Sequence, residues 1–183
     1  FGRIAFVAAS RKWHDHSDGT YVRMVNLAPK AFVRKGTVAV IAKANTPPGI
    51  GAAVEPQFLQ DRLEEFSGAR PVVIGGVSTT IAERGSRAGR DKALAYLEER
   101  YREIGFAPLR VAYSGGVNLV AETIPAKSRV VLLTSHYDSV SNPGADDDGS
   151  GTITVLAAAA RLAQLNLPFT IRVVAFDKEE NGL

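Results

Sequence analysis

The amino-acid sequence predicts an α/β protein, a three-layer sandwich in which a mostly parallel mixed sheet is flanked by helices. Two continuous apolar segments, over residues 129–134 and 169–176, have the length and composition of buried strands. Between them, residues 149–166 are apolar almost all round, so a helix there should be covered on more than one side. Strand, helix and strand with this much burial predict a sheet with helices on both faces.

The part of the chain before this unit predicts further elements from its periodicity and its stop signals. Apolar residues at helical spacing and glycine stops mark two helices, and a serine is the expected N-cap of the second. The expected elements are a helix over 55–66 that Gly68 closes, a short extended piece over 71–77, a helix over 87–104 between Ser86 and Gly105, and a strand over 118–122.

Composition excludes several classes of protein and site. The chain of 183 residues has no cysteine, so disulfides and thiolate metal sites are excluded, and a metal must be held by His, Asp or Glu. No apolar run approaches the roughly 18 residues of a membrane span. The net charge is +3, but eight Lys or Arg stand against two Asp in residues 1–45, and the rest is mildly acidic. We therefore expect no nucleic-acid partner and no membrane span.

Residues 1–50 read as a leader or linker. Met24 is followed by basic residues and by the short apolar run 38–42, and Ala42-Lys43-Ala44 resembles a cleavage site. This order resembles a weak secretory signal and predicts a secreted or periplasmic protein. A leader of another kind, or the tail of an upstream segment, fits the same residues.

Three polar segments follow or precede the buried elements. They are Ser135 to Ser139 after the first strand, Gly144 to Gly151 at the start of the apolar helix, and Asp177 to Leu183 after the second strand. If the two strands are parallel, all three segments lie at the carboxyl edge of the sheet, where α/β proteins place their sites.

The residue types in these segments favour a metal. Carboxylates gathered at one edge repel one another, and a divalent cation relieves that repulsion far more than a helix N-terminus does. The nitrogen of His136 moves the expected metal from calcium or magnesium toward zinc or a similar metal. Taken singly, each segment is more often structural: a strand-end histidine, a helix-capping turn or a solvated acidic turn. Their combination and order reverse that balance.

The three segments together resemble the zinc aminopeptidases of clan MH, which include bacterial leucyl aminopeptidases and glutamate carboxypeptidase. The family pattern is His-x-Asp-Ser, then Gly-Ala-Asp/Asn-Asp-Asp-Gly/Ala-Ser-Gly, then aromatic-Asp-x-Glu-Glu-x-Gly-Leu. The chain shows it at residues 136–139, 144–151 and 176–183, and the resemblance extends over about residues 80–183. It implies a phosphorylase/hydrolase-like fold, with residues 51–183 forming the N-terminal part of a catalytic domain.

The resemblance also implies the role of each site residue. His136 binds one zinc ion, Asp147 bridges two, and Glu180 binds the other. Glu179 is the general base, and Asp138 orients His136. The implied activity is that of a metallo-exopeptidase, an aminopeptidase acting on peptide substrates with two zinc ions.

One departure from the family pattern concerns the remaining ligands. The family supplies an acidic ligand and a histidine after the Glu-Glu pair, and this sequence ends three residues after Glu180. We therefore expect the chain to be an N-terminal fragment, incomplete at its C-terminus and inactive alone. His14 and His16 are poor candidates as substitutes.

Other functions stay open at this point. They are a carboxypeptidase or dipeptidase of the same clan, a glutaminyl cyclase with one zinc ion, a relative that has lost its metals, and a glycosidase using a carboxylate pair. The glycosidase leaves His136 and Asp138 unexplained, and a relative without metals should show broken ligands.

Overall fold

The computed structural model describes residues 54–182. The expected leader or linker over 1–50, its signal segment, and His14 and His16 lie outside the described residues. Within the described part, none of the helices combines the length and apolar character that crossing a membrane requires.

Three helices form where the spacing and stop signals predict them. α1 spans Pro56–Phe66, α2 spans Arg87–Glu103, and α3 spans Gly151–Leu162. The hydroxyl of Ser86 accepts the N–H of Gly89, as expected of the N-cap of α2. α3 begins later than predicted, because an irregular turn over Ala145–Ser150 precedes it, and it ends earlier, at Leu162.

In the part of the chain that the structure describes, six strands form two sheets. The small sheet is a hairpin of β1, Val72–Ile74, and β2, Val77–Thr79. The main sheet has the order β3-β4-β6-β5. Its strands are β3 Phe106–Tyr113, β4 Gly116–Thr123, β5 Val130–His136 and β6 Thr170–Phe176. The predicted strands over 118–122, 129–134 and 169–176 are confirmed. The pattern did not predict β3, an edge strand with Pro108 near its start and few buried residues.

The sheet is mixed, as predicted, but the described strands are not mostly parallel. β5 and β6 are parallel, with His136 paired to Phe176, whereas β3 pairs antiparallel with β4 and β4 with β6. Only two residues, Ser114 and Gly115, separate β3 from β4, and so short a turn can join only antiparallel strands.

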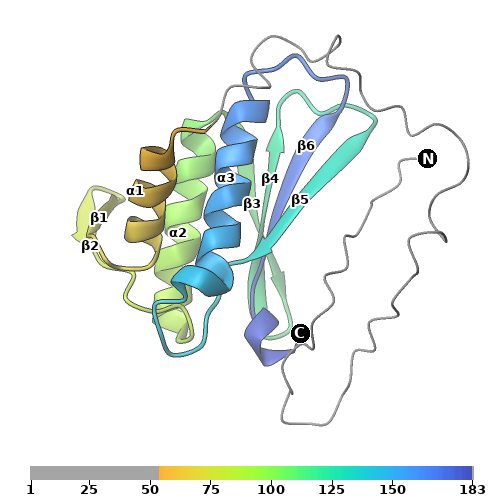
Figure 1. Cartoon of the computed structure of the whole chain (residues 1–183). Helices are drawn as coiled ribbons and strands as arrows, with labels where there is room; N and C mark the ends of the chain where they lie inside the picture. The colour runs from red at the N-terminus through yellow and green to blue at the C-terminus, as the bar shows by residue number, and fades with distance from the viewer. Residues whose placement is uncertain (1–53, 183) are drawn as a thin grey trace, which may run out of the picture. The chain divides into compact units, whose positions relative to one another are not determined.

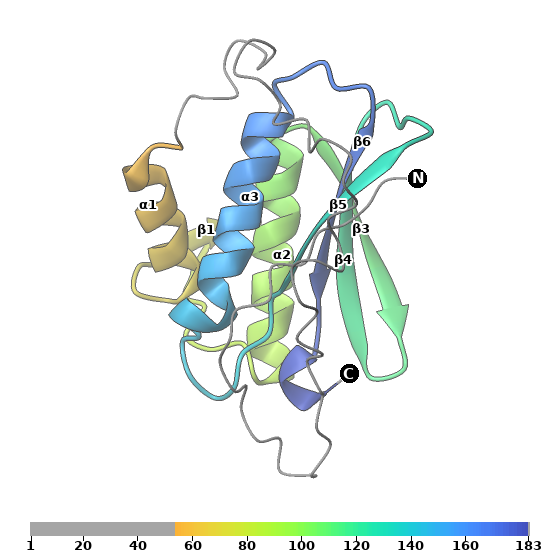
Figure 2. The ribbon, with the colours of Figure 1, turned by 45° about the vertical axis from the view of Figure 1, so that its right-hand side comes forward.

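Of the three layers that the sequence predicts, the described residues form two. α1, α2 and α3 all lie on one side of the main sheet (Figures 1 and 2). The described part therefore has two layers, and the other face exposes apolar side chains, among them Leu109, Leu132 and Phe176. α3 is covered on two sides, by α1 and by the sheet, as its almost uniformly apolar sequence predicts.

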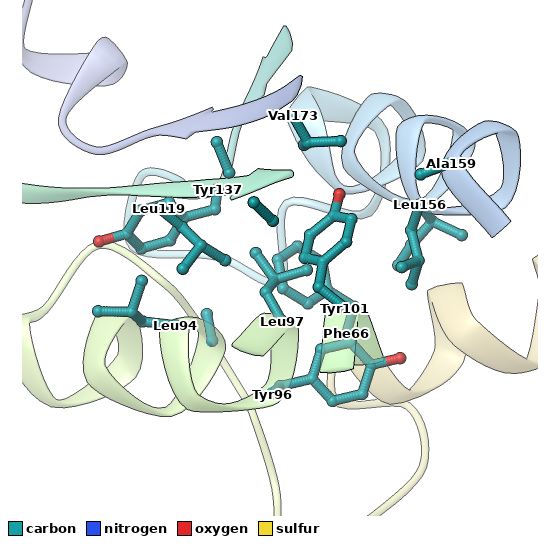
Figure 3. Close-up of a cluster of buried hydrophobic side chains, with 14 of the residues drawn as sticks. Phe66, Leu94, Tyr96, Leu97, Tyr101, Leu119, Tyr137, Leu156, Ala159 and Val173 are labelled. Atoms are coloured by element: carbon teal, nitrogen blue, oxygen red, sulfur yellow. The ribbon is translucent and has the colours of Figure 1, made fainter. Parts of the chain in front are cut away.

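The core lies between the helices and the sheet (Figure 3). Leu94, Leu97 and Tyr101 of α2 face Leu119 of β4 and Val173 of β6, and all five are at most 1% exposed. Each buried aliphatic side chain of this size contributes roughly 1.5–3 kcal/mol. This packing holds α2 and α3 against β4 and β6, and so fixes the strand ends from which the site is built.

Candidate metal centre

The three polar segments meet at one edge of the main sheet. His136 is the last residue of β5 and pairs in register with Phe176, the last residue of β6. The turn over Ala145–Ser150 leads into α3, and a single 3-10 turn over Glu179–Asn181 follows β6. Because β5 and β6 are parallel neighbours, their carboxyl ends lie together, as the sequence predicts.

Three of the predicted site residues converge at this edge. His136, Asp147 and Glu180 each offer one ligand atom, and these atoms all lie within 4.8 Å of one another. Nε2 of His136 lies 3.0 Å from Oδ1 of Asp147 and 3.7 Å from Oε2 of Glu179. The side chains of Asp147 and Glu179 are 76% and 55% exposed, so solvent reaches this side of the cluster.

Asp138 lies behind the cluster and is 2% exposed. Its Oδ1 lies 3.3 Å from Nδ1 of His136, on the side of the ring away from Asp147. Its carboxylate also accepts the backbone N–H groups of Glu179 and Glu180, both at 3.2 Å. One buried carboxylate thus contacts both the histidine ring and the turn that presents the two glutamates.

The backbone of His136 is held by two residues that the sequence interpretation did not assign to the site. Oδ2 of Asp148 accepts the N–H of His136 at 3.2 Å. The hydroxyl of Thr152, in the first turn of α3, donates to the carbonyl of His136 at 2.8 Å. The Asp triplet marks the segment in the sequence, but only the fold shows that its third member faces the backbone of β5.

Asp177 anchors the turn that carries Glu179 and Glu180, and this role also emerged only from the structure. Its Oδ2 accepts the N–H of Val117 at 2.9 Å, and its own N–H donates to the side chain of Asn118 at 2.9 Å. Its Oδ1 lies 3.0 Å from Nε of Arg90, in an ion pair that is nearly buried. The turn is therefore fixed to both β4 and α2.

The electrostatics of the cluster favour a positive charge at its centre. Burial lowers the pKa of His136, but the hydrogen bond with Asp138 and the charges of Asp148 and Glu179 outweigh burial and raise that pKa to about 9. Burial and the charge of Asp147 raise the pKa of Glu180. A ring with a carboxylate at each nitrogen, beside further crowded carboxylates, is a donor set that fits zinc.

Comparisons with known proteins match part of the chain to a peptidase family. Residues 118–183 match the family described as Peptidase family M28. Leucine aminopeptidase 1 of Aspergillus oryzae is 39% identical over 89 residues, which cover 40% of this chain and 23% of that protein. Leucine aminopeptidase 1 of Ajellomyces dermatitidis is 37% identical over 209 residues, covering 100% of this chain and 52% of that protein. The chain thus spans about half the length of the second relative.

A solved structure shares the fold. The Zn-dependent exopeptidase of Parabacteroides distasonis superposes with a TM-score of 0.55 at 20% identity, covering 70% of this chain and 48% of that one. Motifs, fold and family match agree, and the prediction from the three polar segments is confirmed: residues 118–183 match peptidase family M28, and the chain is a relative of the zinc aminopeptidases of clan MH.

Proposed function

We propose that the protein containing this chain is a zinc-dependent aminopeptidase that removes N-terminal residues from peptides. The observation that carries the proposal is the convergence of His136, Asp147 and Glu180, with Glu179 beside them on the exposed side of the cluster. Both relatives described above bear the name leucine aminopeptidase, and the structural neighbour is a Zn-dependent exopeptidase.

We assign two zinc ions to this donor set. His136 would hold one ion, Glu180 the other, and Asp147 both, since a carboxylate has two oxygens. When bound, zinc acts as a Lewis acid that polarises a carbonyl and lowers the pKa of water toward neutrality. Asp138 would keep the ring of His136 in one orientation and one tautomer.

Glu179 is the proposed general base. Its exposed carboxylate lies beside the three ligands, where it can take a proton from the attacking water. The water oxygen forms a bond to the carbonyl carbon of the scissile peptide, and the carbon–nitrogen bond breaks. The proton held by Glu179 passes to the leaving amine, which departs neutral. The backbone contacts of Glu179 and Glu180 with Asp138 would hold that carboxylate in place.

The full natural protein that contains this sequence tests the proposal. After loading with zinc, it should hydrolyse leucine p-nitroanilide and leave N-acetyl-leucine p-nitroanilide intact, because an aminopeptidase requires a free amino group. Asp147→Asn, which weakens a proposed ligand of both ions, should abolish cleavage and release zinc. A protein that binds zinc but does not cleave leucine p-nitroanilide, the substrate with a free amino group, would overturn the proposal.

The same preparation separates the related functions. Removal of C-terminal residues from an N-acetylated peptide would indicate a carboxypeptidase. Ring closure of an N-terminal glutamine with loss of ammonia, in the absence of hydrolysis, would indicate a glutaminyl cyclase. Binding of one zinc ion per chain would contradict the two-ion assignment even if cleavage occurs.

A further inference from the structure

Arg84 is the largest fully buried side chain of the described residues, and its charge has an unusual set of partners. It lies in the segment between β2 and α2 and is 0% exposed. Arginine is seldom buried without a paired carboxylate. Arg84 forms no ion pair with a carboxylate anywhere in residues 54–182, so its partners must be sought elsewhere.

Backbone carbonyls from three segments surround the guanidinium. Nε donates to the carbonyl of Tyr137 at 2.7 Å, and Nη2 donates to that of Gly144 at 2.7 Å. Nη1 donates to Pro143 at 2.5 Å and to Phe66 at 3.1 Å. Only the planar, five-donor fork of arginine can reach four carbonyls in different directions from one buried position.

Two of these segments carry the metal-site residues. Tyr137 stands between His136 and Asp138, and Gly144 begins the loop that leads to Asp147. A Cβ atom added to Gly144 would lie 2.6 Å from Nη2 of Arg84, so the loop passes directly over the guanidinium. Arg84 therefore connects the strand end that presents His136 with the loop that presents Asp147.

The third segment gives the guanidinium a fixed support. Cζ of Arg84 lies 4.4 Å from the centre of the Phe66 ring, and Phe66, the last residue of α1, is 0% exposed. The backbone N–H of Arg84 also donates to the hydroxyl of Ser139 at 3.0 Å. Burial lowers the pKa of Arg84 to about 10, against the charges of Asp138, Asp148 and Glu180, so it is charged at neutral pH.

We propose that Arg84 is a positioning residue of the metal centre, which sets the distance between His136 and Asp147 by binding the backbone carbonyls of Tyr137, Pro143 and Gly144. The inference rests on the proposed function in one respect, that His136 and Asp147 hold a metal. It assigns Arg84 no contact with metal or substrate. Its contribution is geometric, and a cation of different shape at the same position should not replace it.

The first test compares Arg84→Lys with Arg100→Lys in the full natural protein. Lysine keeps the charge but has three donors on one atom and cannot hold four carbonyls. Arg100 is a matched control, since it also lies over an aromatic ring, that of Tyr96 at 5.4 Å, with a mostly buried side chain far from the site in the sequence. Zinc affinity is measured by competition with a chromophoric chelator, and site geometry by the visible spectrum of the cobalt(II) form.

We expect Arg84→Lys to bind zinc about 10-fold to 100-fold more weakly and to show an altered cobalt(II) spectrum, as for other residues that orient metal ligands. Arg100→Lys should keep the wild-type affinity and spectrum. A folded Arg84→Lys protein with both wild-type values would overturn the proposal. Tighter zinc binding by Arg84→Met would also overturn it, since removal of a nearby positive charge would then be the dominant effect.

A second pair of variants applies if Arg84→Lys does not fold. Phe66→Leu removes the ring beneath the guanidinium without replacing a residue of the metal-site segments, and Phe58→Leu removes the ring near Arg62, 5.8 Å away. We expect weaker zinc binding and a changed cobalt(II) spectrum only for Phe66→Leu. Equal behaviour of the two variants would overturn the proposal. Zinc affinity and the cobalt(II) spectrum can be measured without turnover. A protein that binds metal but cleaves no substrate would therefore refute the proposed function, and the same measurements would still test the role of Arg84.

Discussion

The carboxylate of Asp138 lies behind the ring of His136, with Oδ1 3.3 Å from Nδ1, while Nε2 on the opposite side of the ring faces Asp147. The same carboxylate accepts the backbone N–H groups of Glu179 and Glu180. Two neighbouring strand ends, β5 and β6, are thus joined through one buried side chain. The relative position of the histidine and the two glutamates depends on that link.

Asp138→Asn should therefore weaken zinc binding by about 10-fold to 100-fold, the usual cost of losing a group that orients a metal-bound histidine. The amide has one acceptor oxygen, so it cannot face the ring and accept both backbone N–H groups as the carboxylate does. Asp146→Asn makes the same chemical change at an exposed position in the adjacent loop and should leave affinity unchanged. Competition titrations with a chelator measure the zinc affinity of both variants. Equal zinc affinities of Asp138→Asn and Asp146→Asn would contradict the prediction.

Glu179→Gln should keep zinc and lose most turnover. The side chain is a proposed base and not one of the three converging ligands, so its neutral isostere should leave the donor set intact. Loss of a general base typically lowers the rate about 10²–10⁴-fold. Atomic absorption measures whether the variant keeps its zinc, and hydrolysis of leucine p-nitroanilide measures whether it loses turnover. A variant that cleaves as fast as wild type would remove Glu179 from the reaction.

Two buried tyrosines of α2 predict opposite responses to loss of a hydroxyl. Tyr96 donates to Oε2 of Glu65 at 2.9 Å, whereas the hydroxyl of Tyr101 has no hydrogen-bond partner in residues 54–182. Tyr96→Phe should lower the free energy of unfolding by about 1.5–3 kcal/mol, the usual worth of a hydrogen bond to a charged group. Tyr101→Phe should be neutral or stabilising. Urea unfolding compares the two, and a larger loss in Tyr101→Phe would contradict the assignment.

The N-terminus of α2 should make stability depend on pH through Glu83. Hydrogen bonds from the hydroxyl and then the backbone N–H of Ser86 lower the pKa of Glu83 below its usual 4.5. Since the folded-state pKa is the lower one, ionised Glu83 stabilises the fold above pH 4.5, and that contribution is lost as the pH falls through the lowered value. Wild type and Glu83→Gln should differ in unfolding free energy at pH 7 and converge at acid pH.

Two further variants isolate this effect. Ser86→Ala should cost about 1 kcal/mol at pH 7, as expected for an N-cap serine. Glu55→Gln is the control, because Glu55 is a glutamate at the start of another helix, the N-cap position of α1, and its side chain makes no capping hydrogen bond. If Glu55→Gln reproduces the pH profile of Glu83→Gln, the profile does not report the hydrogen bonds to Ser86.

The sequence by itself determined the elements whose signals are local. Ser86 caps α2 because a serine hydroxyl satisfies a free N–H at a helix start wherever it occurs. The apolar runs of β5 and β6 can form buried strands, and polar segments directly after two parallel strands must lie at one edge. For that reason the three polar segments were expected to meet, and the resemblance to the zinc aminopeptidases indicated His136, Asp147 and Glu180 within them as the ligands.

Only the tertiary structure decided the contacts that join segments distant in the chain. Arg84 lies more than 50 residues from the carbonyl of Tyr137 that it binds, and no periodicity or spacing relates the two. Asp148 faces the backbone of His136 because the turn before α3 passes beside β5. β3 is an exposed edge strand, held by its pairing with β4, so it needs no apolar run of its own. Backbone carbonyls and N–H groups are identical at every residue, so a sequence cannot show which of them a side chain will bind; the packing of the helices on the sheet selects them.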